Sequence, residues 1–325
     1  MFRSFFGLTA GLGLILMISS PASSDDEIPT PAEIEAATYV SGPLPEGRTA
    51  LTIKVQTLLD RAHVSPGVID GFSGGMTDSA IRAFETREGL TADGVLDLDV
   101  WTALTWATRK PITARYRIEQ ADLPDNDTLP DDYARLATYE KLGYQRVTER
   151  LAERFHMDED FLRVLNPQAR FEPGETIVVI NTGDPLEGQV DTITVEKASG
   201  RLVARDADGR ILADYPVAVG SDQTPSPEGE MEVRAIAYDP NYTYDPAVNF
   251  KQGQNEETLI LPPGPNGPVG TIWIDLTKPT YGIHGTPEPA KLFVKQSHGC
   301  VRMTNWDARE LADMVGQGVR VTFAP

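Results

Sequence analysis

The stretch IHGTPEPAKLFVKQSHGCVRM, residues 283–303, concentrates the reactive side chains of a chain of 325 residues. It contains Cys300, the one cysteine of the sequence, and two of the four histidines, His284 and His298. A thiol is a good nucleophile only as the thiolate, so a catalytic cysteine needs a base or a cation beside it. His284 lies sixteen positions before Cys300, and a hairpin-like return of the chain can bring the two side chains into hydrogen-bond range.

Chemistry alone leaves three interpretations of this window open. In the first, Cys300 is a nucleophile with His284 as its base, and Ser297 and His298 orient the pair. Gly299 then leaves backbone N–H groups facing an incoming carbonyl, and such a donor contributes about 2.7–4 kcal/mol in another enzyme. In the second, His284, His298 and Cys300 bind zinc, although the sequence has no clear fourth ligand and no HExxH or CxxC motif. In the third, the cysteine is buried and inert, which the polar residues around it disfavour.

The sequence on both sides of this window is typical of β-structure. Residues 192–220 alternate β-prone runs with Ser-Gly and Asp-Gly turns, which predicts an antiparallel meander. TIWIDL, residues 271–276, and VRVTF, residues 319–323, are further predicted strands. Thr304 opens a capping box with Asp307, which predicts one helix directly after the cysteine. The C-terminal part is therefore predicted to be mostly β.

IHGT followed by SHGCVRM resembles the signature of YkuD-type L,D-transpeptidases, a histidine and then Ser/Thr-His-Gly-Cys about fifteen residues later. Upstream, VGSDQTPSPEGEMEV resembles the family's Thr-Pro-x-Pro-x-Gly segment, which is carried here by Thr224, Pro225, Pro227 and Gly229. The resemblance begins at Val190 and implies a β-rich catalytic domain over residues 188–325.

This resemblance implies a role for each residue of the window that matches the signature. It makes Cys300 the nucleophile and His284 the general base, and it leaves Ser297 and His298 to shape the site. The backbone N–H groups of Gly299 and Cys300 are the implied oxyanion donors. The implied reaction needs no metal and no organic cofactor.

Two further residues are candidates for substrate binding. Arg302 stands where a guanidinium can grip a substrate carboxylate, with an ordinary surface arginine as the alternative. Tyr281 can point into the cleft, with packing in the core as the alternative. Many relatives have Asn two places after the cysteine, where this chain has Arg302, so the choice of acceptor stays open.

The first residues of the chain predict export. Arg3 supplies a positive charge, residues 5–18 form an apolar run, and a Ser-Pro-Ala sequence follows. We predict a signal peptide over residues 1–22. The alternative is a retained membrane anchor, but the run is shorter than the roughly 20 residues of a spanning helix. Residues 23–47, rich in Ser, Asp, Glu and Pro, predict a flexible tether.

Residues 48–108 predict a small module of three helices. The apolar residues of the first helix share one face, Thr77 is placed to cap the second, and Trp101 and Leu104 belong to the third. The order of elements resembles the peptidoglycan-binding domain type 1, and a helical module without a ligand is the alternative. The matching residues are Val55, Gln56, Leu59, Gly67, Ile69, Asp70, Gly71, Thr77, Ala80, Phe84, Gly89, Leu90, Asp93, Gly94, Trp101 and Leu104.

Two segments separate the helical module from the β-rich part. Residues 109–140 are polar and rich in Pro and Asp, which predicts a linker. Within residues 141–183, LNPQARFEPGETIVV resembles the second half of a LysM module, although the usual GDTL near the start is missing. A plain spacer of two helices is the alternative.

Charge excludes some classes of partner. The formal net charge is −19 and the pI is about 4.6, so the chain repels phosphate backbones and anionic lipid. We therefore predict neither a nucleic-acid partner nor binding to a membrane surface. In an exported protein a single cysteine cannot form an internal disulfide, so Cys300 is either a buried passenger or a reactive thiol.

The two resemblances together imply a multidomain fold class, a small three-helix peptidoglycan-binding domain plus a mostly-β L,D-transpeptidase domain. They imply a cysteine-dependent acyltransferase of the periplasm or cell wall that crosslinks peptidoglycan stem peptides through a thioester. The implied partners are the stem peptides and the glycan, and β-lactams are implied to acylate Cys300. An L,D-carboxypeptidase, a hydrolase that releases wall-linked protein, and a catalytically silent wall-binding protein are the alternatives.

Overall fold

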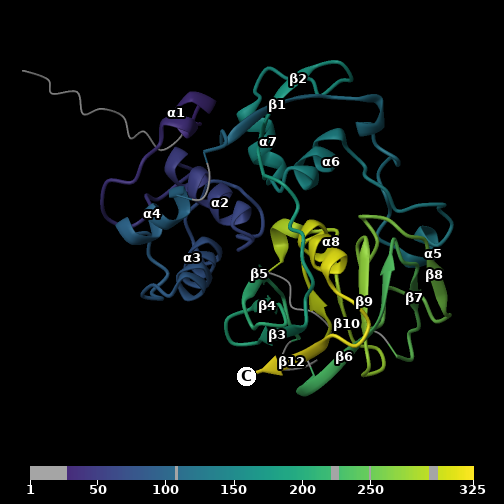
Figure 1. Cartoon of the computed structure of the whole chain (residues 1–325). Helices are drawn as coiled ribbons and strands as arrows, with labels where there is room; N and C mark the ends of the chain where they lie inside the picture. Colours follow the sequence, from purple (N-terminus) through teal and green to yellow (C-terminus); the bar gives the residue numbers. More distant parts are fainter. Residues whose placement is uncertain (1–27, 107–108, 221–226, 249, 293–298) are drawn as a thin grey trace, which may run out of the picture.

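The structure is a computed structural model that describes residues 28–106, 109–220, 227–248, 250–292 and 299–325. Three parts pack against one another: a helical N-terminal module, a small middle module, and a larger domain built on one β-sheet (Figure 1). The predicted signal peptide lies outside the described residues. No helix within the described ranges has the length and the apolar content to cross a membrane.

The N-terminal module contains the three predicted helices. They are α2 (Ala50–Arg61), α3 (Gly75–Glu88) and α4 (Leu98–Trp106), and each packs against the other two around a shared apolar core. α2 begins after Thr49, whose hydroxyl accepts a hydrogen bond from the Thr52 amide at 3.1 Å. Apolar residues at helical spacing predict these elements because each helix buries one face.

Thr77 does not cap α3, contrary to the prediction. The helix begins at Gly75 after an N-cap at Gly74, and Thr77 lies inside the first turn and is buried. Its hydroxyl accepts a hydrogen bond from the side-chain amide of Gln56 at 3.1 Å and donates to the carbonyl of Phe72 at 3.3 Å. The buried Gln56 amide needs hydrogen-bond partners. The Thr77 hydroxyl, which was predicted to cap the helix, is one of these partners instead.

The segment predicted as a flexible tether, residues 23–47, contains a short helix, α1 (Pro31–Ala36). A capping box between Thr30 and Glu33 begins this helix. Ile34 is fully buried, and α1 packs on α2. Burial of such a side chain contributes about 1.5–3 kcal/mol, which holds the segment on the module.

The middle module combines residues from the predicted linker and from the predicted LysM-like segment. β1 (Thr113–Arg117), inside the predicted linker 109–140, pairs antiparallel with β2 (Thr176–Ile180). Between them in sequence lie α6 (Val147–Arg154) and α7 (Glu159–Leu165), which pack against each other. β1 has the sequence TARYR, and its two arginines are exposed. Such a polar sequence does not indicate a strand by itself, because its formation depends on pairing with β2.

In the described residues of the C-terminal domain, eight strands form one sheet in the order β11-β10-β9-β6-β12-β3-β4-β5. Neighbouring strands are antiparallel except for two parallel pairs, β12 with β3 and β10 with β11. The predicted meander, both further strands and the helix after the cysteine are present, which confirms a mostly-β domain. The bounds are β3 (Thr192–Glu196), β4 (Arg201–Arg205), β5 (Ile211–Pro216), β6 (Gly229–Tyr238), β9 (Ile272–Leu276), β10 (Gly282–His284), β11 (Val301–Arg302), α8 (Asn305–Met314) and β12 (Arg320–Ala324).

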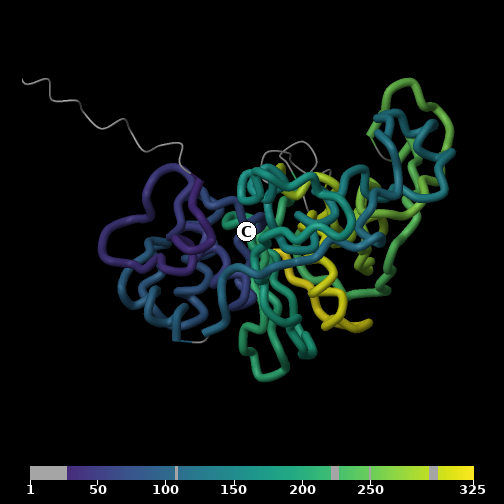
Figure 2. The backbone as a smooth tube through the Cα atoms, turned by 90° about the horizontal axis from the view of Figure 1, so that it is seen from above, coloured from purple at the N-terminus to yellow at the C-terminus, as the bar shows by residue number. Residues whose placement is uncertain are grey.

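An insertion between β6 and β9 forms a lobe at one end of the molecule (Figure 2). Its strands β7 (Tyr242–Tyr244) and β8 (Leu259–Leu261) pair antiparallel. α5 (Tyr133–Leu136), which follows the short η1 (Gln120–Asp122) in the predicted linker, packs on this ribbon. Aromatic contacts join the two segments, with the Tyr133 and Tyr244 rings 5.3 Å apart.

Residues 63–65 of the N-terminal module run along the edge strand β5. The Ser65 amide donates to the Asp214 carbonyl, and the Asp214 amide donates to the His63 carbonyl, both at 2.9 Å. Arg201 of β4 donates from Nε to Asp214 Oδ1 at 2.7 Å and from Nη1 to the Ser65 carbonyl at 3.0 Å. The helical module is therefore fixed on the large sheet by hydrogen bonds to the two residues of a buried ion pair.

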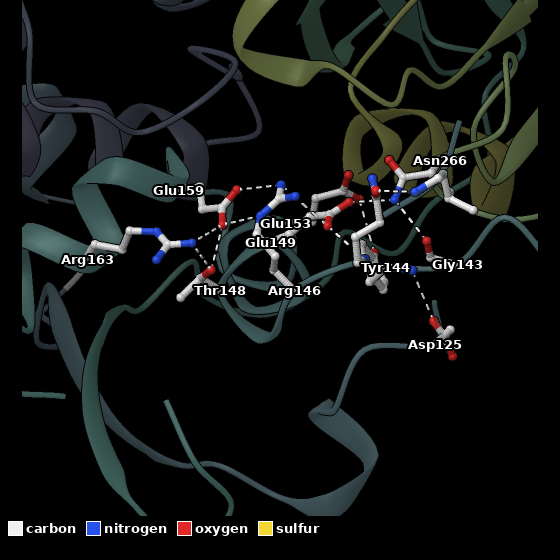
Figure 3. Close-up of polar contacts among 12 residues, drawn as sticks. Asp125, Gly143, Tyr144, Arg146, Thr148, Glu149, Glu153, Glu159, Arg163 and Asn266 are labelled. Atoms are coloured by element: carbon white, nitrogen blue, oxygen red, sulfur yellow. Dashed lines mark hydrogen bonds and ion pairs between the residues drawn. The ribbon is translucent and has the colours of Figure 1, made fainter. Parts of the chain in front are cut away.

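The middle module reaches the C-terminal domain through a polar chain along α6 (Figure 3). Asn266 donates from Nδ2 to the Glu149 carboxylate at 2.5 Å. One turn further, the buried Glu153 accepts from the Tyr144 hydroxyl at 3.1 Å and from the Asn305 amide at 3.1–3.2 Å. Because Asn305 begins α8, this carboxyl joins the middle module to the helix that covers the sheet.

Two carboxyl groups are buried at these junctions, and we expect them to make the folded state less stable as the pH rises. Burial raises the pKa of Glu153 to about 7, and burial likewise raises the pKa of Asp307, which accepts from Ser65 Oγ at 3.0 Å, to about 7. Between an unfolded pKa of about 4 and this folded pKa, the folded state holds more protons than the unfolded chain. The free energy of unfolding therefore decreases with pH, and we expect each of the two carboxyls to lower it by about 2.5 kcal/mol between pH 5 and pH 8.

Urea unfolding at the two pH values measures this difference. Glu153→Gln should reduce the pH dependence, because the amide keeps an acceptor oxygen for Tyr144 and cannot ionise. Glu140→Gln, at an exposed position, is the control and should leave the dependence unchanged. Equal stability of the unsubstituted protein at pH 5 and pH 8 would contradict the prediction.

Candidate active site

The parallel pair β10–β11 joins the two ends of the reactive window. In its register Ile283 lies opposite Val301, and His284 lies opposite Arg302. Ile283 and Val301 are fully buried, and side chains alternate along a strand. His284, Arg302 and Cys300, which directly precedes β11, therefore project from the other face. The return of the chain is a parallel crossover instead of the predicted hairpin-like return, because β11 pairs with β10 in the same direction.

His284 is held as a neutral base. Its Nδ1 lies 2.7 Å from the Gly285 carbonyl, and because a carbonyl only accepts, Nδ1 carries the proton. The lone pair is then on Nε2. Burial, assisted by the charge of Arg302, lowers the pKa of His284 to about 4, although the Gly285 carbonyl opposes this shift. The imidazole is therefore uncharged at neutral pH and ready to accept a proton.

Cys300 rests as a thiol. Burial raises its pKa, and the Gly282 backbone N–H partly offsets this effect. The thiol donates to the Thr280 carbonyl at 3.5 Å. Thr280 has a φ of 70°, which a β-branched residue rarely adopts, so its strained backbone aims this carbonyl at the sulfur. With the thiol and the imidazole both uncharged, a thiolate at Cys300 would have to form by proton transfer.

Trp273 is a residue of the site that the sequence analysis did not single out. It lies opposite His284 in the β9–β10 register, and the two rings stack with centroids 5.6 Å apart and planes at 23°. Gly282 makes room for the indole, because a Cβ there would lie 2.6 Å from its Cζ2 atom. Alternation in TIWIDL places Trp273 on the same face as His284, which is the sequence signal that could have found it.

The remaining predicted site residues lie near this pair or outside the described ranges. Arg302 is half-buried and donates from Nη2 to the Leu292 carbonyl at 3.3 Å. Tyr281 is half-buried, with the Lys278 ammonium 4.7 Å from its ring centroid. Gly299 is buried and has a φ of 110°, a conformation that other residues rarely adopt.

Ser297 and His298 lie outside the described residues, as do Thr224 and Pro225 of the upstream segment. Within the described ranges, no group of three or more His, Cys, Asp or Glu side chains is arranged to hold a metal ion.

Two parts of the chain match known protein families. A sequence profile of the L,D-transpeptidase catalytic domain matches residues 190–322, and one named "Putative peptidoglycan binding domain" matches residues 48–104. The "Putative L,D-transpeptidase YkuD" of Bacillus licheniformis is 31% identical over 182 residues, which cover 54% of this chain and 93% of that protein. The protein of the same name from Bacillus subtilis is 30% identical over 175 residues, with 53% and 90% covered.

Among solved structures, the L,D-transpeptidase from Xylanimonas cellulosilytica is 14% identical, with a TM-score of 0.37, and the match covers 88% of this chain and 100% of that one. The sequence matches define a transpeptidase domain joined to a domain of the peptidoglycan-binding type. The chain belongs to the YkuD family of L,D-transpeptidases.

Proposed function

We propose that the protein crosslinks peptidoglycan by transferring an acyl group of one stem peptide, through a thioester at Cys300, to the amine of another. The observation that carries the proposal is the pairing of β10 with β11, which sets a thiol on the same face of the sheet as a neutral imidazole. Membership of the L,D-transpeptidase family supports this chemistry.

In the first step, the Cys300 thiol gives its proton to His284 Nε2, and the sulfur attacks an amide carbonyl. The amide is the one that joins the third residue of a stem tetrapeptide to its terminal D-alanine. The C–N bond breaks, His284 transfers the proton to the departing amine, and the acyl group stays on sulfur as a thioester.

In the second step, an amine of another stem attacks the thioester carbonyl. His284 takes the amine proton and returns it to the sulfur as the C–S bond breaks. The product is a crosslink between two third-position residues, and the thiol is regenerated. The backbone N–H groups of Gly299 and Cys300 are proposed to stabilise the oxyanion in both steps.

The other predicted residues are proposed to bind or shape the substrate site. Arg302 carries a charge near the reacting pair and is proposed to attract a substrate carboxylate. Tyr281 is proposed to line the cleft, and Ser297 and His298 to shape it. We also propose that β-lactams acylate Cys300, because a strained lactam offers the same carbonyl to the sulfur.

The location of the substrate sets the proposed location of the protein. A domain of the peptidoglycan-binding type and a transpeptidase domain both point to the cell wall or the periplasm. The predicted signal peptide, residues 1–22, is proposed to direct export there.

Mass spectrometry of a purified disaccharide-tetrapeptide tests the function. The protein lacking residues 1–22 should produce a dimer that has lost one D-alanine, and its Cys300→Ala variant should not. A tripeptide monomer without dimer would assign a carboxypeptidase instead. No change with either protein would indicate a domain that only binds the wall.

Trp273→Ala is expected to lower kcat by about 10-fold with little change in KM, because the unstacked imidazole no longer keeps one orientation. Trp273→Phe should retain most of the activity, since a phenyl ring can also stack. Loss of the indole also exposes His284, so the pKa of this imidazole should rise from about 4 towards the ordinary value of a histidine. The acid limb of the pH–rate profile should move to higher pH with it. An unchanged pH profile in Trp273→Ala would remove this positioning role.

A further inference from the structure

A cavity of about 210 Å³ lies where the peptidoglycan-binding module meets the catalytic domain. One side is the loop of residues 66–77 in the helical module. The other side is η2 (Pro289–Lys291) with Leu292, which belong to the crossover between the two reacting residues. Two domains of different families thus form the walls of a single hollow.

Phe72 supplies one wall with an aromatic ring, and this residue is 44% exposed. The guanidinium of Arg48 lies over this ring, 4.6 Å from the centroid, and Arg48 Nε donates to the Asp70 carbonyl at 2.7 Å. The ring is therefore held in place although it faces solvent. A fixed aromatic face beside a hollow suits the apolar face of a sugar ring.

Asp70 supplies a polar contact in the same cavity. Its Oδ1 accepts from Gln56 Nε2 and from the Phe72 amide, both at 2.9 Å. Among the residues that the structure describes, none donates a hydrogen bond to its Oδ2. Because Asp70 lines the cavity, that oxygen is available to accept a hydrogen bond from a ligand hydroxyl or amide. Pockets for drug-sized ligands hold roughly 300–1,000 Å³, so this smaller cavity suits one sugar unit.

The cavity is connected to the reacting residues through its Leu292 wall. Arg302 donates from Nη2 to the Leu292 carbonyl at 3.3 Å. Arg302 is also the residue opposite His284 in the sheet register. A ligand in the cavity therefore lies one residue away from the arginine that flanks the active site.

We propose that this cavity is a glycan subsite shared by the two domains, and that it holds a sugar ring of the strand whose stem peptide enters the active site. The proposal rests on the proposed function, since it names where part of the same substrate lies. The fixed junction between the module and the sheet, through Arg201 and Asp214, keeps the subsite at a constant distance from Cys300. The binding module then orients the substrate in addition to retaining the protein on its polymer.

Gly75 offers a variant that adds bulk at the wall of the cavity. It lines the cavity in the first turn of α3, and a Cβ added there meets no atom within 4 Å. Gly75→Phe should therefore add a bulky ring at the edge of the hollow, where the first atom of the new side chain has open space. Gly316 also has open space around an added Cβ and does not line the cavity, so Gly316→Phe is the matched control. Phe72→Ala removes the ring by a second route.

Steady-state kinetics of the protein from residue 23 to residue 325 test the subsite with two substrates. One is a glycan strand that carries tetrapeptide stems, and the other is the free tetrapeptide. We expect Gly75→Phe and Phe72→Ala to raise KM for the strands about 3- to 10-fold relative to the free peptide, the size of one aromatic contact. Gly316→Phe should leave the ratio of the two KM values unchanged.

An unchanged ratio in both cavity variants would overturn the proposal. An equal rise for the free tetrapeptide would also overturn it, since the cavity would then hold the peptide. Failure of the proposed function is distinguishable, because no protein would then convert either substrate. In that case co-sedimentation with stem-free glycan strands decides the matter. It compares the single variant Cys300→Ala with the double variant that also carries Gly75→Phe, and equal binding of the two would reject the subsite.

Discussion

His284→Gln is expected to reduce the rate of thioester formation at Cys300 by about 10²- to 10⁴-fold, the usual contribution of a general base. The reason is the resting state of the pair. Burial raises the pKa of the Cys300 thiol and lowers the pKa of His284 to about 4, so little thiolate exists before substrate binds. Without an imidazole to take the proton, the sulfur attacks as a poor nucleophile.

The pH dependence gives this prediction its sharpest test. His284 is in its base form above a pKa of about 4, so the rate in the unsubstituted protein should hold down to about pH 5 and fall below it. In His284→Gln the residual rate should rise steadily with pH, because it then follows the small thiolate fraction. Time-resolved mass spectrometry of the adduct with a β-lactam measures both rates. Similar rates in the two proteins at pH 7 would show that another group is the base.

Arg201→Met is expected to lower the free energy of unfolding by about 3–5 kcal/mol, the usual cost of removing one partner of a buried ion pair. Arg201 and Asp214 are both almost fully buried, and the pair is 2.7 Å apart. Arg201 also donates to the Ser65 carbonyl, so the substitution removes a hydrogen bond across the junction as well. The helical module should therefore loosen from the sheet.

Urea unfolding of Arg201→Met and of Arg201→Met with Asp214→Leu measures this loss. The double variant should recover part of the stability, because no buried charge is left without a partner. Burial already raises the pKa of Asp214, and loss of Arg201 removes the main opposing influence. The single variant should therefore lose more stability at pH 8 than at pH 5. Arg210→Met, at an exposed ion pair, is the control. A cost below 1 kcal/mol would refute the role of the pair.

Much of the fold was predictable because it depends on local patterns. Helical spacing in α2, α3 and α4, and turn residues between β3, β4 and β5, are properties of neighbouring residues. Thr304 caps α8 as predicted, with its hydroxyl accepting from the Asp307 amide at 3.1 Å. The reactive window was likewise visible, because three rare residues occur within a short stretch, although the roles of Cys300 and His284 stay predictions.

Elements that depend on distant partners were not predictable in this way. The strand β1 forms only when β2 pairs with it, and α1 is ordered because Ile34 is buried against α2. The stacking of Trp273 on His284 depends on the β9–β10 register and on the absence of a side chain at Gly282.

By itself the sequence determined the family, the order of the domains' main elements, and the residues on which chemistry is expected. Tertiary structure alone decided that the reactive strands pair in parallel, that Arg201 fixes the helical module to the sheet, and that a cavity opens between the two domains. The physical reason is that pattern and propensity act between residues close in sequence. Register, burial of charge and cavities arise only when segments far apart in the chain meet.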